Sequence, residues 1–526
     1  MTLTGKNYLG RELSSEGKLT FQATDPSTGQ ELPGVFFDAT EEEVKWAGEK
    51  AARAFQEYRN FSGAKRAEFL RQVADEILAL GDDLIDRCVS ETGLPAGRIT
   101  GERGRTMNQL KLFADVIEEG SWVDARIDTA IPDREPIPKP DLRYMHKAIG
   151  PVGVFGASNF PLAFSVAGGD TASAFAAGCP VVTKAHPAHP GTCELIASAI
   201  VMAAEKLGLP EGIFSMVHGR SVDVGLALVR HPQIKAVGFT GSYGGGKALF
   251  DEAVRRPEPI PFYAEMSSIN PVFILPKAMK ERRQQISEGL SASVALGVGQ
   301  FCTNPGLVIT SPGSDGDALA NLTAEISNDV ASATMLSEGI KINYDDKLSF
   351  VSSQEGVEVI GKGKDEAGEN TGQAHVLKTS ARNFISNKTL ETEVFGPSTL
   401  MVTTDDRNEL LEIANGLEGH LTATLHGTDD ELDDYADLLN ILEQKVGRLI
   451  INGYPTGVEV CHSMVHGGPF PATTDSRSTS VGTAAIYRFA RPISYQNFPQ
   501  SLLPDELKDN NPLSIWRMID GKRGNK

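Results

Sequence analysis

Three side chains of this sequence, a thiol, a carboxylate and a carboxamide, lie at the ends of strand-like segments or in loops next to them. Cys302 lies in the segment GQFCT, between an apolar helical stretch and the strand-like GLVIT. Glu265 ends the strand-like PFYAEM, and Asn159 lies in the loop GASNFP that follows PVGVFG. A nucleophile, a water-activating base and an oxyanion donor are the groups that acyl chemistry through a thioester requires. A lone cysteine is more often a small buried hydrophobe, so it is the two neighbours that favour a catalytic thiol.

A glycine-rich segment, GSYGGGK at 241–247, offers a different chemistry. It follows the strand-like KAVGFT and precedes a helix, a context in which glycines and helix N-terminal amides hold phosphate. Position 248 is Ala, however, where a nucleotide triphosphatase needs Ser or Thr to ligate magnesium. The segment therefore leaves three interpretations open: a plain turn, a pyrophosphate cradle of another sort, and, as a remote alternative, a P-loop-like nucleotide triphosphatase.

The cysteines indicate a reducing compartment. Five of them are scattered without CxxC spacing, at Cys88, Cys179, Cys193, Cys302 and Cys461. Their odd number and scatter argue against a disulfide framework and against a zinc site. We therefore expect a cytoplasmic protein with no metal site.

The composition excludes several classes of protein. The chain has 526 residues, 40% of them hydrophobic, and 50 basic against 69 acidic residues give a net charge of −19. That balance repels phosphate backbones, so no nucleic-acid partner is expected. The N-terminus lacks the apolar core of a signal peptide, and no apolar stretch approaches the length of a membrane span, so no membrane partner is expected either.

The segments between these motifs indicate an α/β fold. Thr40 and Glu43 form a capping box before an amphipathic helix, and residues 64 to about 120 continue as a helical layer. Short apolar runs then alternate with helices over 151–276, including a helix over 165–177, and again over about 280–460. Such alternation is typical of parallel sheets covered by helices. The proline-rich segment 131–140 and the strand-like DLRYMHKAIG after it predict an extended arm.

Seven motifs in the same order along the chain resemble the aldehyde dehydrogenase superfamily. They are GASNFP (156–161), VVTKAHP (181–187), FTGS (239–242), AEMSSINP (264–271), GQFCT (299–303), EVFGP (393–397) and the pair Asn452-Gly453. Together with the alternation above, the resemblance implies a Rossmann-like cofactor-binding domain at 1–125 and 150–262 and an α/β catalytic domain at 263–462. It also implies a small β oligomerisation arm with a C-terminal tail, at 126–149 and 463–526. An extended hairpin is marginal unless its edge is paired, so a homodimer or homotetramer is expected.

The resemblance also implies a role for each matching position. Cys302 would be the nucleophile, Asn159 the oxyanion donor and Glu265 the general base; this intact set argues against a catalytically silent relative. The implied cofactor-binding residues are Phe155, Lys184, His186, Arg220, Gly241, Ser242, Glu393 and Phe395. Simpler interpretations stay open for three of them: a solvated charge for Lys184, a helix cap for Glu393 and core packing for Phe395.

The sequence departs from the family pattern beside the strand-end lysine. Relatives that prefer NAD usually carry an acidic residue at the position of Pro187, next to His186. Its absence removes a charge that would repel the 2′-phosphate of NADP. Arg220, after the next strand, is placed to meet that phosphate. We therefore expect NADP as the cofactor, with NAD possible.

The C-terminal segment GVEVCHSMVHGGPFPATTDSRSTSVGT resembles two NADP-linked branches of the superfamily. One oxidises 2,5-dioxopentanoate (α-ketoglutaric semialdehyde) to 2-oxoglutarate, and the other oxidises long-chain fatty aldehydes. The first is the expected activity and the second the alternative. Arg105 aligns with a tunnel-lining position and would bind the carboxylate of the semialdehyde. His462 is the candidate to assist catalysis, ahead of His466.

Overall fold

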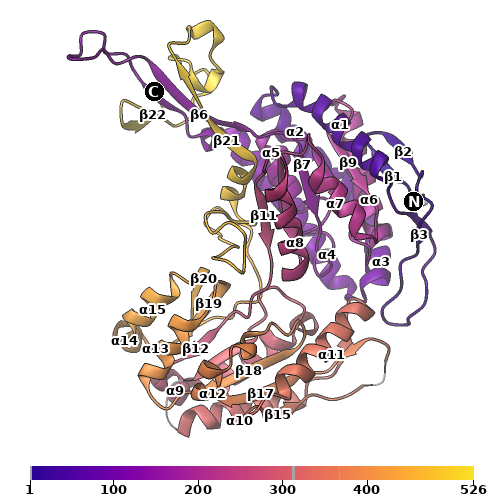
Figure 1. Ribbon diagram of the computed structural model, residues 1–526, viewed down its shortest axis with the longest axis vertical. Helices are drawn as coiled ribbons and strands as arrows, with labels where there is room; N and C mark the ends of the chain where they lie inside the picture. Colours follow the sequence, from indigo (N-terminus) through magenta and orange to yellow (C-terminus); the bar gives the residue numbers. More distant parts are fainter. Residues whose placement is uncertain (1–2, 311–313, 367, 526) are drawn as a thin grey trace.

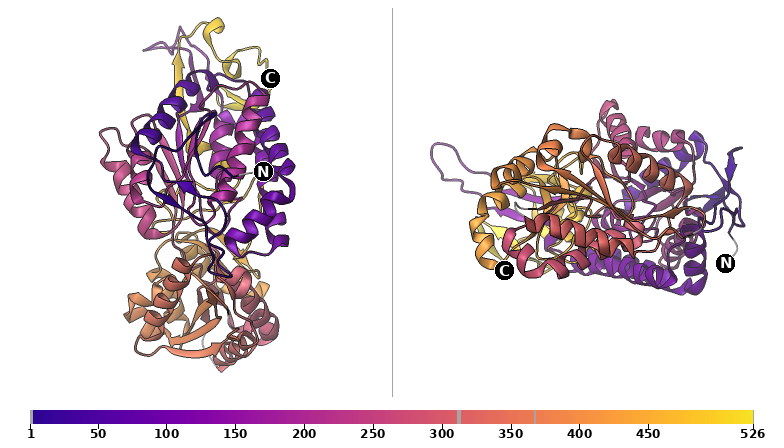
Figure 2. Two further views of the ribbon diagram at one scale, coloured as in Figure 1. Left: turned by 90° about the vertical axis from the view of Figure 1, so that its right-hand side faces the viewer. Right: turned by 90° about the horizontal axis from the view of Figure 1, so that it is seen from below.

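The computed structural model describes residues 3–310, 314–366 and 368–525 (Figure 1). Two α/β lobes lie one above the other, and an arm of strands projects from the upper lobe (Figures 1 and 2). Within the described residues no helix is long and apolar enough to cross a bilayer. The predicted fold class, α/β with two largely parallel sheets and a small β arm, is confirmed.

The upper lobe contains a seven-stranded sheet in the order β11-β10-β7-β8-β9-β1-β2. Strands β7 to β11 are mutually parallel, and β1 and β2 extend the edge in antiparallel fashion. The strands are β1 (Asn7–Leu9), β2 (Glu12–Ser14), β7 (Val152–Phe155), β8 (Val181–Lys184), β9 (Phe214–Val217), β10 (Ala236–Thr240) and β11 (Phe262–Glu265). The parallel strands carry their C-terminal ends to one edge, which is where open α/β sheets bind ligands.

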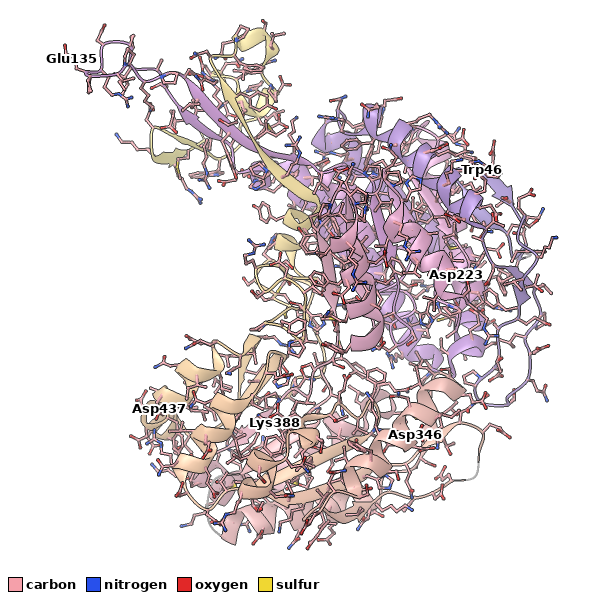
Figure 3. The ribbon with its side chains drawn as sticks, in the orientation of Figure 1. Trp46, Glu135, Asp223, Asp346, Lys388 and Asp437 are labelled. Carbon is pink, nitrogen blue, oxygen red and sulfur yellow. The ribbon has the colours of Figure 1, made fainter. Side chains whose placement is uncertain are left out.

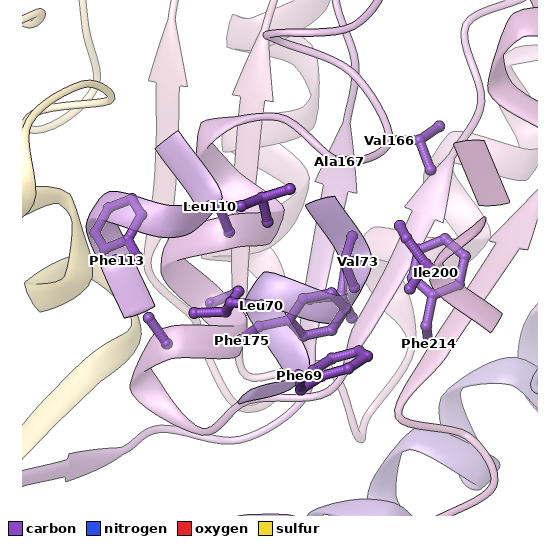
Figure 4. Packing of buried hydrophobic residues seen from close by; sticks show 14 of the residues in the cluster. Phe69, Leu70, Val73, Leu110, Phe113, Val166, Ala167, Phe175, Ile200 and Phe214 are labelled. Carbon is purple, nitrogen blue, oxygen red and sulfur yellow. The ribbon is translucent and has the colours of Figure 1, made fainter. Parts of the chain in front are cut away.

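Helices cover both faces of this sheet. They are α1 (Glu41–Tyr58), α2 (Gly63–Ala79), α3 (Gly81–Thr92), α4 (Ala96–Glu119), α5 (Gly169–Ala177), α6 (Pro190–Lys206), α7 (Val222–Arg230) and α8 (Tyr243–Arg255). The predicted capping box of α1 is present, with Thr40 Oγ1 accepting from Glu43 N at 3.1 Å and the Glu43 carboxylate accepting from Thr40 N at 2.8 Å. Aromatic and aliphatic side chains of α2, α4, α5, α6 and β9 interlock in the core of the lobe (Figure 4).

One predicted helix begins later than expected. Helix α5 starts at Gly169 rather than at residue 165. The preceding residues form a loop, because the buried Glu102 carboxylate accepts hydrogen bonds from Leu162 N and Ala163 N, both at 2.9 Å. This loop carries Asn159.

The lower lobe contains a second seven-stranded sheet, in the order β15-β17-β18-β13-β12-β19-β20. Its strands are β12 (Val272–Ile274), β13 (Leu307–Thr310), β15 (Glu358–Lys362), β17 (His375–Ser380), β18 (Ser398–Thr403), β19 (His420–His426) and β20 (Val446–Ile451). Its helices are α9 (Pro276–Ala295), α10 (Ser314–Asn328), α11 (Glu338–Ser352), α12 (Ala381–Ser386), α13 (Arg407–Gly416), α14 (Asp429–Asp434) and α15 (Ala436–Leu442). Two short strand pairs complete the lobes: β3 (Thr20–Phe21) with β4 (Phe36–Phe37), and β14 (Ala333–Thr334) with β16 (Thr371–Gly372).

The arm is a five-stranded sheet in the order β21-β6-β5-β22-β23. Its strands are β5 (Arg126–Asp128), β6 (Leu142–Ala148), β21 (Ala490–Gln496), β22 (Arg517–Ile519) and β23 (Lys522–Gly524). The proline-rich loop between β5 and β6 carries Glu135 away from both lobes (Figure 3). The C-terminal tail adds β22 and β23 to the arm by pairing with β5.

Part of the segment expected in the arm lies elsewhere. Residues 463–489 run back from the lower lobe along the upper lobe before β21 begins (Figure 1). Met266 N donates to Ala472 O at 2.8 Å, and the backbones of Glu265 and Thr473 form an isolated antiparallel β-bridge. These contacts bring a C-terminal segment against the end of β11.

Candidate active site

The thiol of Cys302 lies in a loop of the lower lobe, before strand β13. The loop follows α9 and the short 3₁₀ turn η2 (Leu296–Gly299) and leads into β13. Asn270 Nδ2 donates to the carbonyl oxygens of Cys302 at 2.8 Å and of Asn304 at 2.9 Å. Asn270 Oδ1 accepts from Ser268 Oγ and Thr422 Oγ1. This buried amide therefore fixes the backbone that carries the thiol.

A glycine allows the same loop to approach the EVFGP motif. Gly299 has φ +65°, and a Cβ at this position would lie 2.2 Å from the carbonyl carbon of Gly396. Both the dihedral angle and the close approach exclude other residues. The glycine at 299 thus lets Cys302 and the Glu393–Phe395 segment face the same space.

Glu265 and His466 lie beside the thiol. Glu265 Oε1 is 2.9 Å from His466 Nε2, and Glu265 Oε2 accepts from Ser480 Oγ at 2.9 Å. The same imidazole nitrogen lies 3.4 Å from Cys302 Sγ. The structure therefore brings together the predicted base at the end of β11, the predicted nucleophile of the lower lobe and two residues of the segment 463–489.

The electrostatics of the site keep the thiol protonated and the carboxylate charged. Burial raises the pKa of Cys302 well above its ordinary value, and the negative Glu265 raises it further. Burial also raises the pKa of Glu265, but the charge of His466 and hydrogen bonds from His466, Cys302 and Ser480 outweigh that effect and lower it overall. A protonated thiol next to an ionised carboxylate can pass its proton to that carboxylate on attack.

Asn159 faces the thiol from the loop before α5. Its side-chain Nδ2 donates to Gln300 O at 3.0 Å, and its backbone carbonyl oxygen accepts from Arg98 Nη2 at 2.7 Å. The Arg98 guanidinium also lies over the rings of Phe160 and Phe301, 5.1 and 5.0 Å from their centres. One arginine thus clamps the amide loop against the thiol loop.

Two cavities meet at Cys302. One, of about 720 Å³, runs from His186, Gly241 and Ser242 to Asn159, Cys302, Glu393 and Phe395. The other, of about 460 Å³, is lined by Arg105, Arg448, Glu459, His466 and three phenylalanines. Cys302 lines both, so a group entering from either side reaches the sulfur.

The predicted cofactor-binding residues fall into two groups. His186, Gly241, Ser242, Glu393 and Phe395 line the larger cavity. Three others are placed differently: Phe155 is buried against Phe239, Lys184 donates to Ala185 O at 3.3 Å, and the Arg220 side chain is exposed. Burial lowers the pKa of Lys184 to about 8.

The larger cavity fits a nicotinamide dinucleotide. Ser242 caps the N-terminus of α8, where backbone amides favour a pyrophosphate, and a Cβ at Gly244 would meet nothing within 4 Å. At the far end the Glu393 carboxylate and the Phe395 ring offer a partner for a ribose and a face for a ring. The volume lies in the range usual for cofactor sites.

Two sequence-based candidates lie away from this chemistry. His462 is exposed, and it is His466, four residues later, that contacts Glu265 and Cys302. Lys247 donates both to Oδ1 and to Oδ2 of Asp251 on its own helix, each at 2.7 Å. The segment 241–247 therefore contributes a helix N-terminus to the larger cavity, without the lysine contact of a P-loop.

Sequence reasoning missed several residues of the site. Arg448 and Arg98 carry no local motif that marks them, since each reaches the site from a distant element. Asn270 lies in the AEMSSINP motif and Ser480 in the C-terminal segment 457–483, but neither residue was singled out there. His466 had a signal, because it lies in the same histidine-bearing segment as His462. Only the return of that segment to β11 distinguishes the two.

Comparisons with known proteins agree with this arrangement. The sequence profile of the Aldehyde dehydrogenase family matches residues 13–470. The chain is 50% identical over 525 residues to the Alpha-ketoglutaric semialdehyde dehydrogenase 2 of Azospirillum brasilense, covering 99% of this chain and all of that one. It is 44% identical over 518 residues to the Alpha-ketoglutaric semialdehyde dehydrogenase of Acinetobacter baylyi, covering 98% of each.

Solved structures give the same fold. The betaine aldehyde dehydrogenase of Staphylococcus aureus in complex with NAD⁺ superimposes with a TM-score of 0.80 at 19% identity, covering 94% of this chain and 95% of that one. With a family profile over most of its length and two full-length relatives, the chain belongs to the aldehyde dehydrogenase family, as its seven motifs predicted.

Proposed function

We propose that this enzyme oxidises 2,5-dioxopentanoate to 2-oxoglutarate, with NADP as the preferred cofactor. The observation that carries the substrate assignment is a pair of guanidinium groups, Arg105 and Arg448, in the cavity on the substrate side of Cys302. The two full-length relatives bear the name of this semialdehyde, which supports the same choice.

The two arginines bind backbone carbonyls, and the carboxylates whose charges act on Arg105, among them Glu102 and Glu459, form no ion pair with it. Arg105 donates to Val458 O at 3.4 Å, and Arg448 donates to the carbonyls of Pro455 and Gly457. In the part of the chain that the structure describes, neither has a carboxylate within ion-pair distance, and burial lowers the pKa of both. A substrate carboxylate would supply the missing charge, whereas an alkyl chain would leave both cations buried and unpaired.

The walls of this cavity suit a short carbon chain between the cations and the sulfur. Phe160, Phe164 and Phe301 line it, and Arg105 lies over the Phe164 ring at 5.2 Å. The apolar walls exclude water from the chain, and the arginines fix the charged end. The aldehyde carbon is then left for Cys302.

The mechanism follows from the contacts around the sulfur. Glu265 takes the proton of the Cys302 thiol as Sγ bonds to the aldehyde carbon, which gives a thiohemiacetal. The Asn159 amide and the Cys302 backbone N–H hold the developing oxyanion. A bound nicotinamide dinucleotide supplies the acceptor for the hydride that leaves this carbon. Glu265 releases the thiol proton to solvent and, supported by Ser480 and His466, then takes a proton from the water that hydrolyses the thioester.

The cofactor preference rests on the adenosine side of the site. Pro187 itself brings no carboxylate next to His186, and the nearby Asp38 carboxylate already accepts from the backbone amides of Arg220 and Ser221. Arg220 follows β9 with an exposed side chain, free to turn toward the 2′-phosphate of NADP. NAD would bind more weakly at the same site.

The arm and the thiol support two further proposals. Strand β21 is at the edge of the arm sheet, which favours pairing in a homodimer or homotetramer. Cys302 must stay a free thiol to act, which favours the cytoplasm, a reducing compartment.

The test compares aldehydes and arginine variants. We expect kcat/KM on 2,5-dioxopentanoate to exceed that on decanal, and to fall about 10- to 100-fold in Arg448→Met and in Arg105→Met, since each loses a charged hydrogen bond. The matched control is Arg103→Met on the same helix, because Arg103 donates to Gly81 O and does not line the cavity. A preference for decanal, unchanged in both cavity variants, would contradict the assignment and favour the fatty aldehyde activity.

A further inference from the structure

The centre of the site gathers three different ligand types around one point. Cys302 Sγ, His466 Nε2 and a carboxylate oxygen of Glu265 all lie within 4.8 Å of one another. A thiolate, an imidazole and a carboxylate are the three groups that bind Zn²⁺ in proteins, and three protein ligands with one open position are typical of accessible zinc sites.

We propose that Zn²⁺ binds to Cys302, His466 and Glu265 and inhibits the enzyme reversibly. Binding itself needs only these three side chains; that it inhibits rests on the proposed role of Cys302 as nucleophile.

Two of the three ligand distances fit a tetrahedral ion after a small movement, and the third, between Cys302 Sγ and the Glu265 carboxylate, is within 4.8 Å. Zinc lies about 2.3 Å from sulfur and about 2.0–2.2 Å from nitrogen or oxygen, so its ligands are roughly 3.4–3.6 Å apart. Cys302 Sγ and His466 Nε2 are already 3.4 Å apart, and His466 Nε2 and Glu265 Oε1 are 2.9 Å apart. A shift of about half an ångström opens the second pair.

The surroundings support the ion in three ways. Ser480 Oγ donates to Glu265 Oε2, which orients the carboxylate and leaves Oε1 for the metal. Both cavities reach Cys302, which gives an entry path and a fourth position for water. The thiol loses its proton to solvent on binding, so a thiolate and a carboxylate neutralise the two positive charges in a buried site.

His466 is the residue that completes a three-ligand metal site. A cysteine and a glutamate alone would offer two ligands, and the imidazole adds the third. Bound zinc would occupy the sulfur that attacks the aldehyde and the carboxylate that takes its proton. Aldehyde and metal therefore compete for one atom.

The test separates metal binding from turnover. Cd²⁺ is titrated into the full-length enzyme while the ultraviolet thiolate-to-Cd²⁺ charge-transfer band is recorded, and Zn²⁺ is used to compete. In parallel, Zn²⁺ inhibition and its reversal by EDTA are measured with any aldehyde that the enzyme oxidises. The binding experiment needs no substrate, so it stays decisive if the semialdehyde assignment fails.

Four variants identify the ligands. We expect one metal ion per chain in the wild type and in Cys461→Ala, which removes the other partly exposed thiol. His466→Phe keeps an aromatic ring against Phe164 but removes one metal ligand. Loss of a residue that only hydrogen-bonds a ligand lowers metal affinity roughly 10- to 100-fold, so loss of the ligand itself should lower it at least as much. Glu265→Gln should weaken binding as well, and Cys302→Ser should abolish the band.

Two results would overturn the proposal. One is an equal metal affinity in the wild type and in both His466→Phe and Glu265→Gln, which would show that the thiol of Cys302 binds the metal without the other two side chains. The other is a band that disappears in Cys461→Ala.

Discussion

At the scale of single residues, one imidazole nitrogen contacts both the proposed nucleophile and the proposed base. His466 Nε2 contacts both Cys302 Sγ and Glu265 Oε1, and it can carry only one proton. If that proton points to the carboxylate, Nε2 donates a hydrogen bond to Glu265 and keeps the carboxylate oriented and ionised. The same nitrogen then cannot accept a hydrogen bond from the Cys302 thiol. The charged Glu265 beside the thiol, which raises the pKa of Cys302, is then the group that accepts the thiol proton.

This arrangement makes a prediction about the thiol's titration. Burial and the Glu265 charge both raise the pKa of Cys302, so the thiolate fraction, and with it the rate of alkylation, grows as pH rises. Glu265→Gln removes the charge but leaves the burial. We expect its alkylation profile to move to lower pH while staying above that of an ordinary cysteine.

The measurement is the rate of iodoacetamide alkylation against pH, in a Cys461→Ala background so that one partly exposed thiol reports. Ser480→Ala serves as a control that keeps the carboxylate charge. A profile that moves to higher pH in Glu265→Gln would show that the carboxylate stabilises the thiolate, contrary to the mechanism.

A second residue-scale prediction concerns the cofactor. Arg220→Ala removes the exposed cation expected to meet a 2′-phosphate, so KM for NADP should rise about tenfold while KM for NAD changes little. Initial rates with each cofactor give the ratio. Arg230→Ala, a cation at the other end of α7 paired with Glu252, is the control. An unchanged NADP/NAD ratio in Arg220→Ala would remove Arg220 from the cofactor site.

At the scale of elements, helix α4 supports the site from behind. It sends Arg98 to the Asn159 carbonyl, Glu102 to the amides of Leu162 and Ala163, and Arg105 into the substrate cavity. The three side chains are separated by four and three residues, which places them on one face of a helix. A single helix therefore positions the loop that carries Asn159 and contributes Arg105 to the proposed substrate cavity.

The hydrogen bond from Arg98 to the loop that carries Asn159 predicts that loss of Arg98 slows the chemical step more than it weakens substrate binding. Arg98→Met keeps the contact with the Phe160 and Phe301 rings but loses the hydrogen bond to Asn159 O. We expect kcat to fall about tenfold with little change in KM, because a misplaced oxyanion donor acts on the transition state. Arg98→Lys should recover part of the rate.

The measurement is steady-state kinetics together with thermal unfolding, and Arg103→Met on the same helix is again the matched control. An equal loss in both variants would mean that α4 stability, and not the clamp, determines the rate.

At the scale of the whole molecule, the active site exists only where three parts of the chain meet. The upper lobe supplies Asn159 and Glu265, the loop before β13 supplies Cys302, and the segment 463–489 supplies His466 and Ser480. The same segment then becomes β21 of the arm (Figure 1). The arm and the catalytic centre are therefore connected by a short stretch of chain.

The arm predicts an oligomer. Strand β21 is an edge strand with exposed side chains at Arg491, Ser494 and Gln496. We expect a mass of two or four times 56.4 kDa by light scattering. Ser494→Pro should shift the protein toward the monomer, because proline removes an N–H from the strand, while Ser494→Thr should not. A monomeric wild type would contradict the proposal.

Much of this protein is determined by local sequence. Apolar runs alternating with helical periodicity predict two parallel sheets, because period and length are properties of each segment. The motifs around Cys302, Glu265 and Asn159 identify chemistry that the structure then brings together. The capping box of α1 is predicted for the same reason, since its partners are three residues apart.

Other features were decided only by the tertiary structure. The choice of His466 over His462 depends on the return of segment 463–489 to β11. Arg448 on β20 and Arg105 on α4 are 343 positions apart in the sequence, and only the packing of the two lobes makes them line one cavity. The late start of α5 follows from a buried carboxylate on α4. Each of these depends on groups far apart in the chain, and their burial and charge are properties of the packed molecule and not of any segment.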